Sequence, residues 1–64
     1  MKIGDYILYK NNITDTIQTE LGKVKSFADD GDPFVVYHCN NDWDNYKNYT
    51  GEKTPKEKCK VINQ

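Results

Sequence analysis

The chain has 64 residues, of which ten are acidic and nine are Lys, with no Arg and a formal net charge of -1 at pH 7. A chain of this length hides only about 60% of its unfolded surface, which leaves little core for pockets of roughly 300 Å³ or more. We therefore expect one domain, residues 1–64, that is not an enzyme and holds no cofactor. The missing Arg argues against a dedicated DNA-binding protein, because Arg supplies the planar fork that binds phosphate and guanine.

The first ten residues predict a turn followed by a strand. Gly4 and Asp5 form the turn signal, and the apolar and aromatic run from Tyr6 to Tyr9 suits a strand. Residues 11–18 are polar with two isolated Ile residues, and they suit a long loop or an irregular hairpin.

A half-buried strand is predicted for residues 20–27, since small and apolar residues alternate with lysines there. The residues expected on one face are Gly22, Val24 and Ser26, and those expected on the other are Lys23 and Lys25. Gly22 inside a strand indicates a bend or a close approach of another backbone.

Asp30-Gly31 is the clearest turn signal of the chain. The run after it, FVVYHC (residues 34–39), is β-branched and aromatic on both faces and predicts a central strand. By alternation, the residues expected in the core are Phe34 and Val36, with Val24 and either Tyr6 or Leu8 opposite them.

Residues 40–45 break this pattern, and residues 46–50 resume strand character that Gly51 ends. Thr54 and Glu57 form a capping-box pattern, with Pro55 at the first helical position. One helical turn, of α or 3₁₀ type, is therefore expected before a last strand at residues 60–62.

These elements predict an all-β fold, a small antiparallel barrel of five strands with one short helical turn before the last strand. Closure is expected because an open sheet of this size leaves unpaired edges.

The order of these segments resembles the SH3-like small barrels, and among them the Tudor- and KOW-like branch. The matching positions are Gly4-Asp5, Gly22-Lys23-Val24 and the turn from Thr54 to Glu57. Residues 42–51 are also similar to short uncharacterised proteins of phages and mobile elements of low-GC bacteria. The resemblance implies a binding module but no particular ligand, since a fold does not fix a function.

No apolar run approaches the length of about 18 residues that spans a bilayer, and no signal-peptide core follows Met1. We expect a cytoplasmic protein without a membrane partner, located in the host cytoplasm if the chain is phage-encoded.

No metal site is expected. His38 and Cys39 are neighbours on a strand and point to opposite faces, and the chain has no Cys-x-x-Cys pair. Asp42 and the residues around it suit Asx turns better than a calcium loop. Cys39 and Cys59 favour two reduced thiols over a bridge in a reducing compartment, although bridged and metal-bound forms stay open.

Eight aromatic residues are more than so small a core requires. In Tudor-like barrels, such rings form a cage or groove for cations or peptides, and a cation–π contact contributes about 0.5–2 kcal/mol. The predicted binding surface consists of Tyr9, Tyr37, Asp42, Trp43, Asp44, Tyr46 and Tyr49. The alternative is that Trp43 is a lid over an undersized core. The acidic residues Asp29, Asp30 and Asp32 are expected either to border this surface or to form a solvated turn.

The sequence favours a non-catalytic module that docks on a protein partner, as an inhibitor or modulator of a host factor. One alternative is nucleic-acid association through tyrosines and the lysines Lys23, Lys25, Lys47, Lys53, Lys56, Lys58 and Lys60. A second alternative is a redox or metal response through Cys39 and Cys59. The oligomeric state is open.

Overall fold

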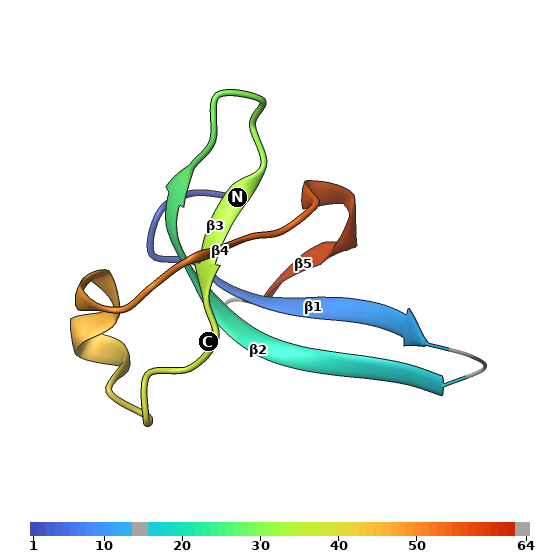
Figure 1. Ribbon diagram of the computed structural model, residues 1–64, viewed down its shortest axis with the longest axis horizontal. Coiled ribbons are helices and arrows are strands. Elements are labelled where there is room, and N and C mark those ends of the chain that lie inside the picture. The colour runs from blue at the N-terminus through green and yellow to red at the C-terminus, as the bar shows by residue number, and fades with distance from the viewer. Residues whose placement is uncertain (14–15, 63–64) are drawn as a thin grey trace.

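The computed structural model of the protein describes residues 1–13 and 16–62, with the side chains of residues 11–13, 16 and 17 excepted. The elements, in chain order, are β1 (Tyr6–Ile13), β2 (Thr16–Phe27), β3 (Pro33–Val36), the 3₁₀ helix η1 (Trp43–Asn48), β4 (Glu52–Lys53), the 3₁₀ helix η2 (Lys56–Lys58) and β5 (Cys59–Ile62) (Figure 1).

The five strands form one antiparallel sheet in the order β4-β3-β2-β1-β5. The expected all-β class, the five strands and the helical turn before the last strand are confirmed. β4 and β5 are the two edges of the sheet and are joined through η2, and closure into a barrel stays a prediction. Among the described residues, no helix has the length and apolar character needed to cross a membrane.

The β1–β2 hairpin is longer than the sequence suggested. Residues 11–18 were expected to form a loop or an irregular hairpin, but β1 runs to Ile13 and β2 starts at Thr16, with these two residues paired. Regular pairing continues outward from Tyr6 and Lys23, so the ladder overrides the low strand propensity of the polar residues. Residues 14 and 15 lie outside the described part of the chain. The hairpin projects from the rest of the molecule (Figure 1).

The core centres on Ile7, Val24 and Val35, which are fully buried. The expected core residues Phe34 and Tyr6 or Leu8 were therefore wrong. Val35 lies directly opposite Val24 in the sheet, and directly opposite residues share a face. The side chains packed against this core are Tyr9, Tyr37, Cys59 and Val61.

Val36 is buried as expected, but on the other face of the sheet, opposite Lys23. The register shifts between Val24 and Ser26, so a β-bulge in β2 brings Val35 opposite Val24 where unbroken pairing from the turn would have placed Val36. The prediction that β3 buries apolar residues on both faces is confirmed.

At Gly22 the sequence indicated a bend or a close approach of another backbone, but the atoms that come close belong to the side chains of Val35 and Tyr37. A Cβ atom there would lie 2.8 Å from Cε1 of Tyr37 and would overlap Cγ1 of Val35. The missing side chain therefore lets β3 and the segment after it pack directly on β2.

The turns on either side of β3 use positive φ angles. The predicted turn between β2 and β3 has Gly31 at φ 91° and is confirmed. After β3, Asn40 and Asn41 have φ angles of 52° and 64°, and the Asp42 N–H donates to the Cys39 carbonyl at 2.8 Å. Two consecutive positive φ angles with this hydrogen bond are typical of a type I′ turn, which Asn tolerates well.

The strand expected at residues 46–50 was wrong, because η1 occupies most of this segment and β4 is the short pair Glu52–Lys53. The expected capping box was also wrong, since η2 has no side-chain cap. The buried Thr54 instead shares a 2.8 Å hydrogen bond with the Tyr37 hydroxyl and donates to the Glu52 carbonyl at 3.2 Å. Thr54 thereby ties the end of β4 to the residue that follows β3.

Replacing Gly22 by Ala is expected to destabilise the protein by about 3 kcal/mol, because the added methyl group overpacks a full core. Gly31→Ala is the matched control. Its Cβ would have Lys56 Nζ at 3.7 Å as its nearest neighbour, so only the positive φ opposes it, at about 1 kcal/mol. Urea unfolding of both variants measures the difference, and equal losses would contradict the close approach.

Candidate binding surface

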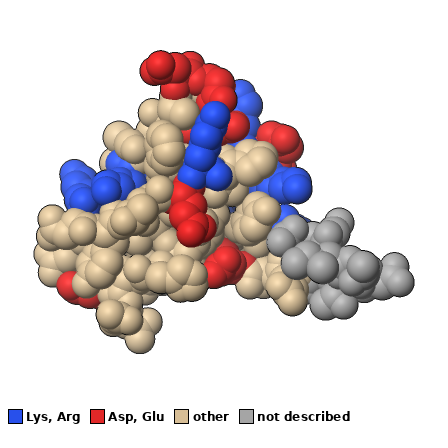
Figure 2. Space-filling view, in the orientation of Figure 1, with Lys and Arg blue, Asp and Glu red and all other residues tan. Residues whose placement is uncertain are grey.

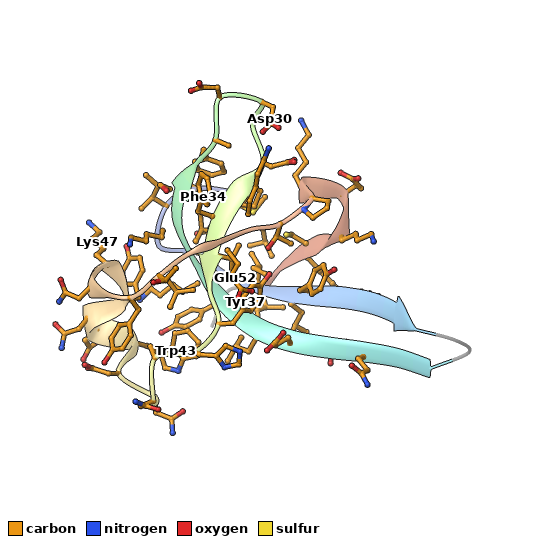
Figure 3. All side chains as sticks on the ribbon, in the orientation of Figure 1. Asp30, Phe34, Tyr37, Trp43, Lys47 and Glu52 are labelled. Atoms are coloured by element: carbon orange, nitrogen blue, oxygen red, sulfur yellow. The ribbon has the colours of Figure 1, made fainter. Side chains whose placement is uncertain are left out.

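η1 lies against the face of β2 opposite to the Ile7–Val24–Val35 core. None of its six residues, Trp43–Asn48, is buried, although Trp43 and Tyr46 are half-buried. Figure 3 shows Trp43 and Lys47 on this segment, at the side of the molecule away from β5. The rings of η1 are thus mounted on the surface of the sheet and do not belong to the central core.

The Lys23 ammonium group lies over two aromatic rings and binds the backbone next to a third. Its Nζ atom lies 4.8 Å from the Tyr6 ring centroid and 4.5 Å from that of Tyr46. The same atom donates to the Trp43 carbonyl at 3.4 Å, and the Trp43 ring meets Tyr6 edge-on, with centroids 5.8 Å apart. We call these four residues the Lys23 cluster. A cation enclosed in this way stabilises the rings around it by about 0.5–2 kcal/mol.

Lys25 holds the other end of η1. Its Nζ donates to the Tyr49 carbonyl at 2.7 Å, one residue after the helix ends. Lys23 and Lys25 both reach the η1 segment, so their side chains lie on the same side of β2. Together the two lysines fix the first residue of η1 and the residue that follows it.

Asp42 organises the start of η1. Its carboxylate accepts from the Asn45 side-chain amide at 3.0 and 3.1 Å and from the Tyr49 hydroxyl at 3.4 Å. Burial and the negative charge of Asp42 both raise the pKa of Tyr49, so this hydroxyl stays protonated and donating. Asp44, by contrast, is exposed to solvent.

Tyr9 and Tyr37 do not join this surface. Their ring centroids lie 6.1 Å apart, and both side chains pack against the core on the other face of the sheet. Of the seven predicted site residues, the structure brings together those from Asp42 to Tyr49 and sets these two tyrosines apart. Its packing against the core and its hydrogen bond with Thr54 give Tyr37 a structural role.

The sequence did not single out Tyr6 and Lys23 as members of one site. They are directly opposite each other on β1 and β2. The only signal was the register of the hairpin, because directly opposite residues share a face.

The turn acids form a separate group. Asp30 pairs with Lys53 at 2.6 Å, which lowers the pKa of the carboxyl group and raises that of the ammonium group. Figure 2 shows acidic side chains gathered at the tip formed by the β2–β3 turn, and Figure 3 places Asp30 far from Trp43. These acids therefore do not border the η1 segment.

Cys39 and Cys59 are both free thiols. Cys39 is buried, and the Cys59 thiol donates to the Pro55 carbonyl at 3.5 Å. Burial raises the pKa of Cys59, which disfavours the reactive thiolate. Within residues 1–13 and 16–62, no three His, Cys, Asp or Glu side chains come together as a metal site would require.

Comparison with known proteins finds no matching family model, no similar curated protein and no similar solved structure. The resemblance to SH3-like barrels and the phage or mobile-element origin stay predictions from the sequence.

Removing the Lys23 ammonium is expected to destabilise the protein by about 1–2 kcal/mol, since Lys23→Ala loses two ring contacts and a carbonyl bond. Trp43 fluorescence should shift to longer wavelength as water enters the cluster. Lys10→Ala, at an exposed position on β1, is the control and should change neither quantity. Unchanged stability and emission in Lys23→Ala would rule out the cluster.

The raised pKa of Tyr37 predicts that the folded protein loses stability at alkaline pH. Burial raises its pKa to about 12 from the ordinary value of 10.0. Between these two values the unfolded chain releases the proton and the folded protein keeps it, so the free energy of unfolding falls as pH rises. Tyr37→Phe removes this contribution.

Tyr37→Phe should be less stable than wild type at neutral pH by about 1 kcal/mol, because Thr54 loses its partner. That difference should shrink between pH 10 and pH 12. Denaturant unfolding of both proteins across this interval provides the measurement, and parallel curves would argue against the buried hydroxyl.

Proposed function

We propose that this protein is a non-catalytic binding module that docks on a protein partner through the η1 surface, defined as the side chains of Asp42, Trp43, Asp44, Tyr46, Lys47 and Tyr49. The observation that carries the proposal is that a Trp and a Tyr sit on a six-residue helix with no buried residue. The central core is built from other residues, so these rings are available for contact with a partner.

Aromatic side chains suit this role. Protein interfaces are enriched in Trp and Tyr, and a few such rings contribute most of the binding energy. Trp43 and Tyr46 still expose part of their surface, which a partner would remove from water.

The two clamping lysines support binding in a second way. Lys23 and Lys25 already fix the backbone of η1 in the free protein through the Trp43 and Tyr49 carbonyls. A segment that is ordered before binding loses less conformational entropy on docking. The surface is therefore prepared for a partner without a costly rearrangement.

The charges on the surface favour a partner with basic groups near Trp43. Asp44 and Lys47 are both exposed, but the Lys47 ammonium group also lies 5.9 Å from the Tyr46 ring centroid, whereas Asp44 is next to Trp43 in the chain. Exposed charges at the rim of an interface act mainly on the association rate and on the choice of partner.

Internal contacts weaken the nucleic-acid alternative. Lys23 and Lys25 are bound to carbonyl groups of the chain itself, and Lys53 is paired with Asp30. Three of the seven proposed phosphate contacts are thus already engaged. The redox alternative is weakened by the buried Cys39 and by the raised pKa of Cys59.

The test begins with affinity capture from a lysate of the source organism, followed by measurement of the dissociation constant with the purified partner. Asp44→Lys reverses an exposed charge on the η1 surface and should raise this constant by about tenfold. Asp29→Lys reverses an exposed charge in the β2–β3 turn and is the matched control, with no change expected.

Trp43→Ala should weaken the same complex by about 100-fold, the effect of losing an interface anchor. Circular dichroism checks that the variant is folded. A partner that binds wild type, Asp44→Lys and Trp43→Ala with equal affinity would exclude the η1 surface as its docking site.

A further inference from the structure

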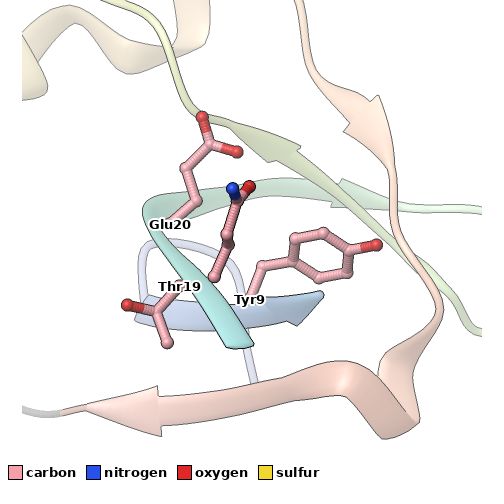
Figure 4. A pocket seen from close by; sticks show the side chains of 4 residues that line it. Tyr9, Thr19 and Glu20 are labelled. Carbon is pink, nitrogen blue, oxygen red and sulfur yellow. The ribbon is translucent and has the colours of Figure 1, made fainter. Parts of the chain in front are cut away.

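The outer edge of β2 is open along more than half of the strand. β3 pairs with β2 only between Lys23 and Phe27. From Thr16 to Gly22, β2 has β1 on one side, and no strand in the described part of the chain pairs with its other side. A hollow of about 400 Å³ lies at this part of the hairpin, lined by Tyr9, Gln18, Thr19 and Glu20 (Figure 4).

The backbone direction at this edge follows from Val24. Its N–H donates to the Asp5 carbonyl at 2.9 Å, and its carbonyl accepts from Gly4 N–H at 2.8 Å, so its polar groups point toward the β1 side. Backbone groups alternate between the two sides along a strand. The N–H and C=O groups of Thr19 and Leu21 therefore point to the open side.

This edge lacks the features that keep sheet edges from pairing. Natural proteins protect such edges with Lys, Pro, bulges or short strands. The open segment Gln18–Gly22 has no Lys and no Pro, and Glu20 is its single charge. The outer edge of β1 differs, because its first residue beyond the pairing with β5 is Lys10.

We propose that a second copy of the chain pairs with this edge, β2 against β2 in antiparallel orientation, centred on Thr19. In this register Thr19 lies opposite Thr19 of the other copy, and Gln18 lies opposite Glu20. In this register the backbone of Leu21 of each copy also lies opposite that of residue 17 of the other copy. The Thr19 pair and these two symmetric pairs exchange two hydrogen bonds each, about six in total. The Gln18 amide of one copy faces the Glu20 carboxylate of the other, whose Oε1 also lies 3.4 Å from His38 Nε2.

Neighbouring registers do not fit. Centring the pair on Glu20 would oppose two carboxylates, which is unfavourable. It would also align backbone groups that already bind β1. Centring it on Leu21 would place Thr19 opposite Lys23, whose outer side is taken by Val36. The Thr19 register is therefore self-complementary, and this inference is independent of the η1 surface.

Charge exchange at Thr19 tests the proposal. Thr19→Lys and Thr19→Glu each place two like charges opposite each other and should raise the dimer dissociation constant by about fivefold or more. An equimolar mixture of the two variants should form a heterodimer, because Lys then faces Glu. Sedimentation across a concentration series measures all three samples and wild type. Asp29→Lys, at an exposed position in the β2–β3 turn, is the control and should dimerise like wild type.

Amide hydrogen exchange supplies a second measurement on the wild-type protein. The amides of Gln18 and Glu20 face β1 and should be protected at every concentration. Those of Thr19 and Leu21 should gain protection only as the concentration rises. A wild-type protein that stays monomeric up to millimolar concentration would overturn the proposal. So would a dimer that Thr19→Lys leaves intact, or variants that fail to pair when mixed.

Discussion

The alternation of side chains along β2 is the constraint on which the rest of the structure depends. On one face, Gly22 and Val24 admit β3 and build the core. On the other face, Lys23 and Lys25 reach η1 and hold it by its carbonyl groups. Because the side-chain period of a strand is two, a slip of one residue would exchange these faces and disrupt both at once. The register of a single strand thus determines the core and the candidate binding surface together.

Lys23 makes its contacts within the protein and so contributes to the packing of this small domain. A long aliphatic stem can lie along apolar surface while the ammonium group finds polar partners. Lys23 combines both, since its head lies between the Tyr6 and Tyr46 rings and its donors reach a carbonyl. A short chain can cover the second face of its sheet in this way without a second large apolar core, which its length would not supply.

The sequence predicted those parts of the fold that local chemistry decides. The turn at Asp30-Gly31 and the helical turn at Lys56–Lys58 both follow from nearby residues. The inward residues of β3 were predicted wrongly, because a bulge in the neighbouring strand shifts the register and leaves no mark in β3 itself. The pairing with β2 therefore decides which side chains of β3 face the core, and the sequence of β3 alone does not.

The same reason limited the prediction of the site. Tyr46 and Tyr49 are of a residue type that favours strands. Contacts from Lys23 and Lys25 nevertheless stabilise the 3₁₀ helix η1 in this segment. The aromatic residues of η1 could be proposed from composition alone. Tyr6 and Lys23 join them only through the pairing of β1 with β2. Tyr9 and Tyr37 were assigned to the wrong group, because burial of a ring depends on the face of the sheet that carries it.

The position of β5 has a consequence for biosynthesis. The β1–β2 hairpin joins near neighbours in the chain, whereas β5 pairs Ile62 with Tyr6 at the opposite end. Closing the longer loop loses more entropy, and β5 leaves the ribosome after the other four strands of this sheet. The growing chain therefore carries a second unpaired edge along Tyr6–Tyr9 until residues 59–62 have been synthesised and have paired with it.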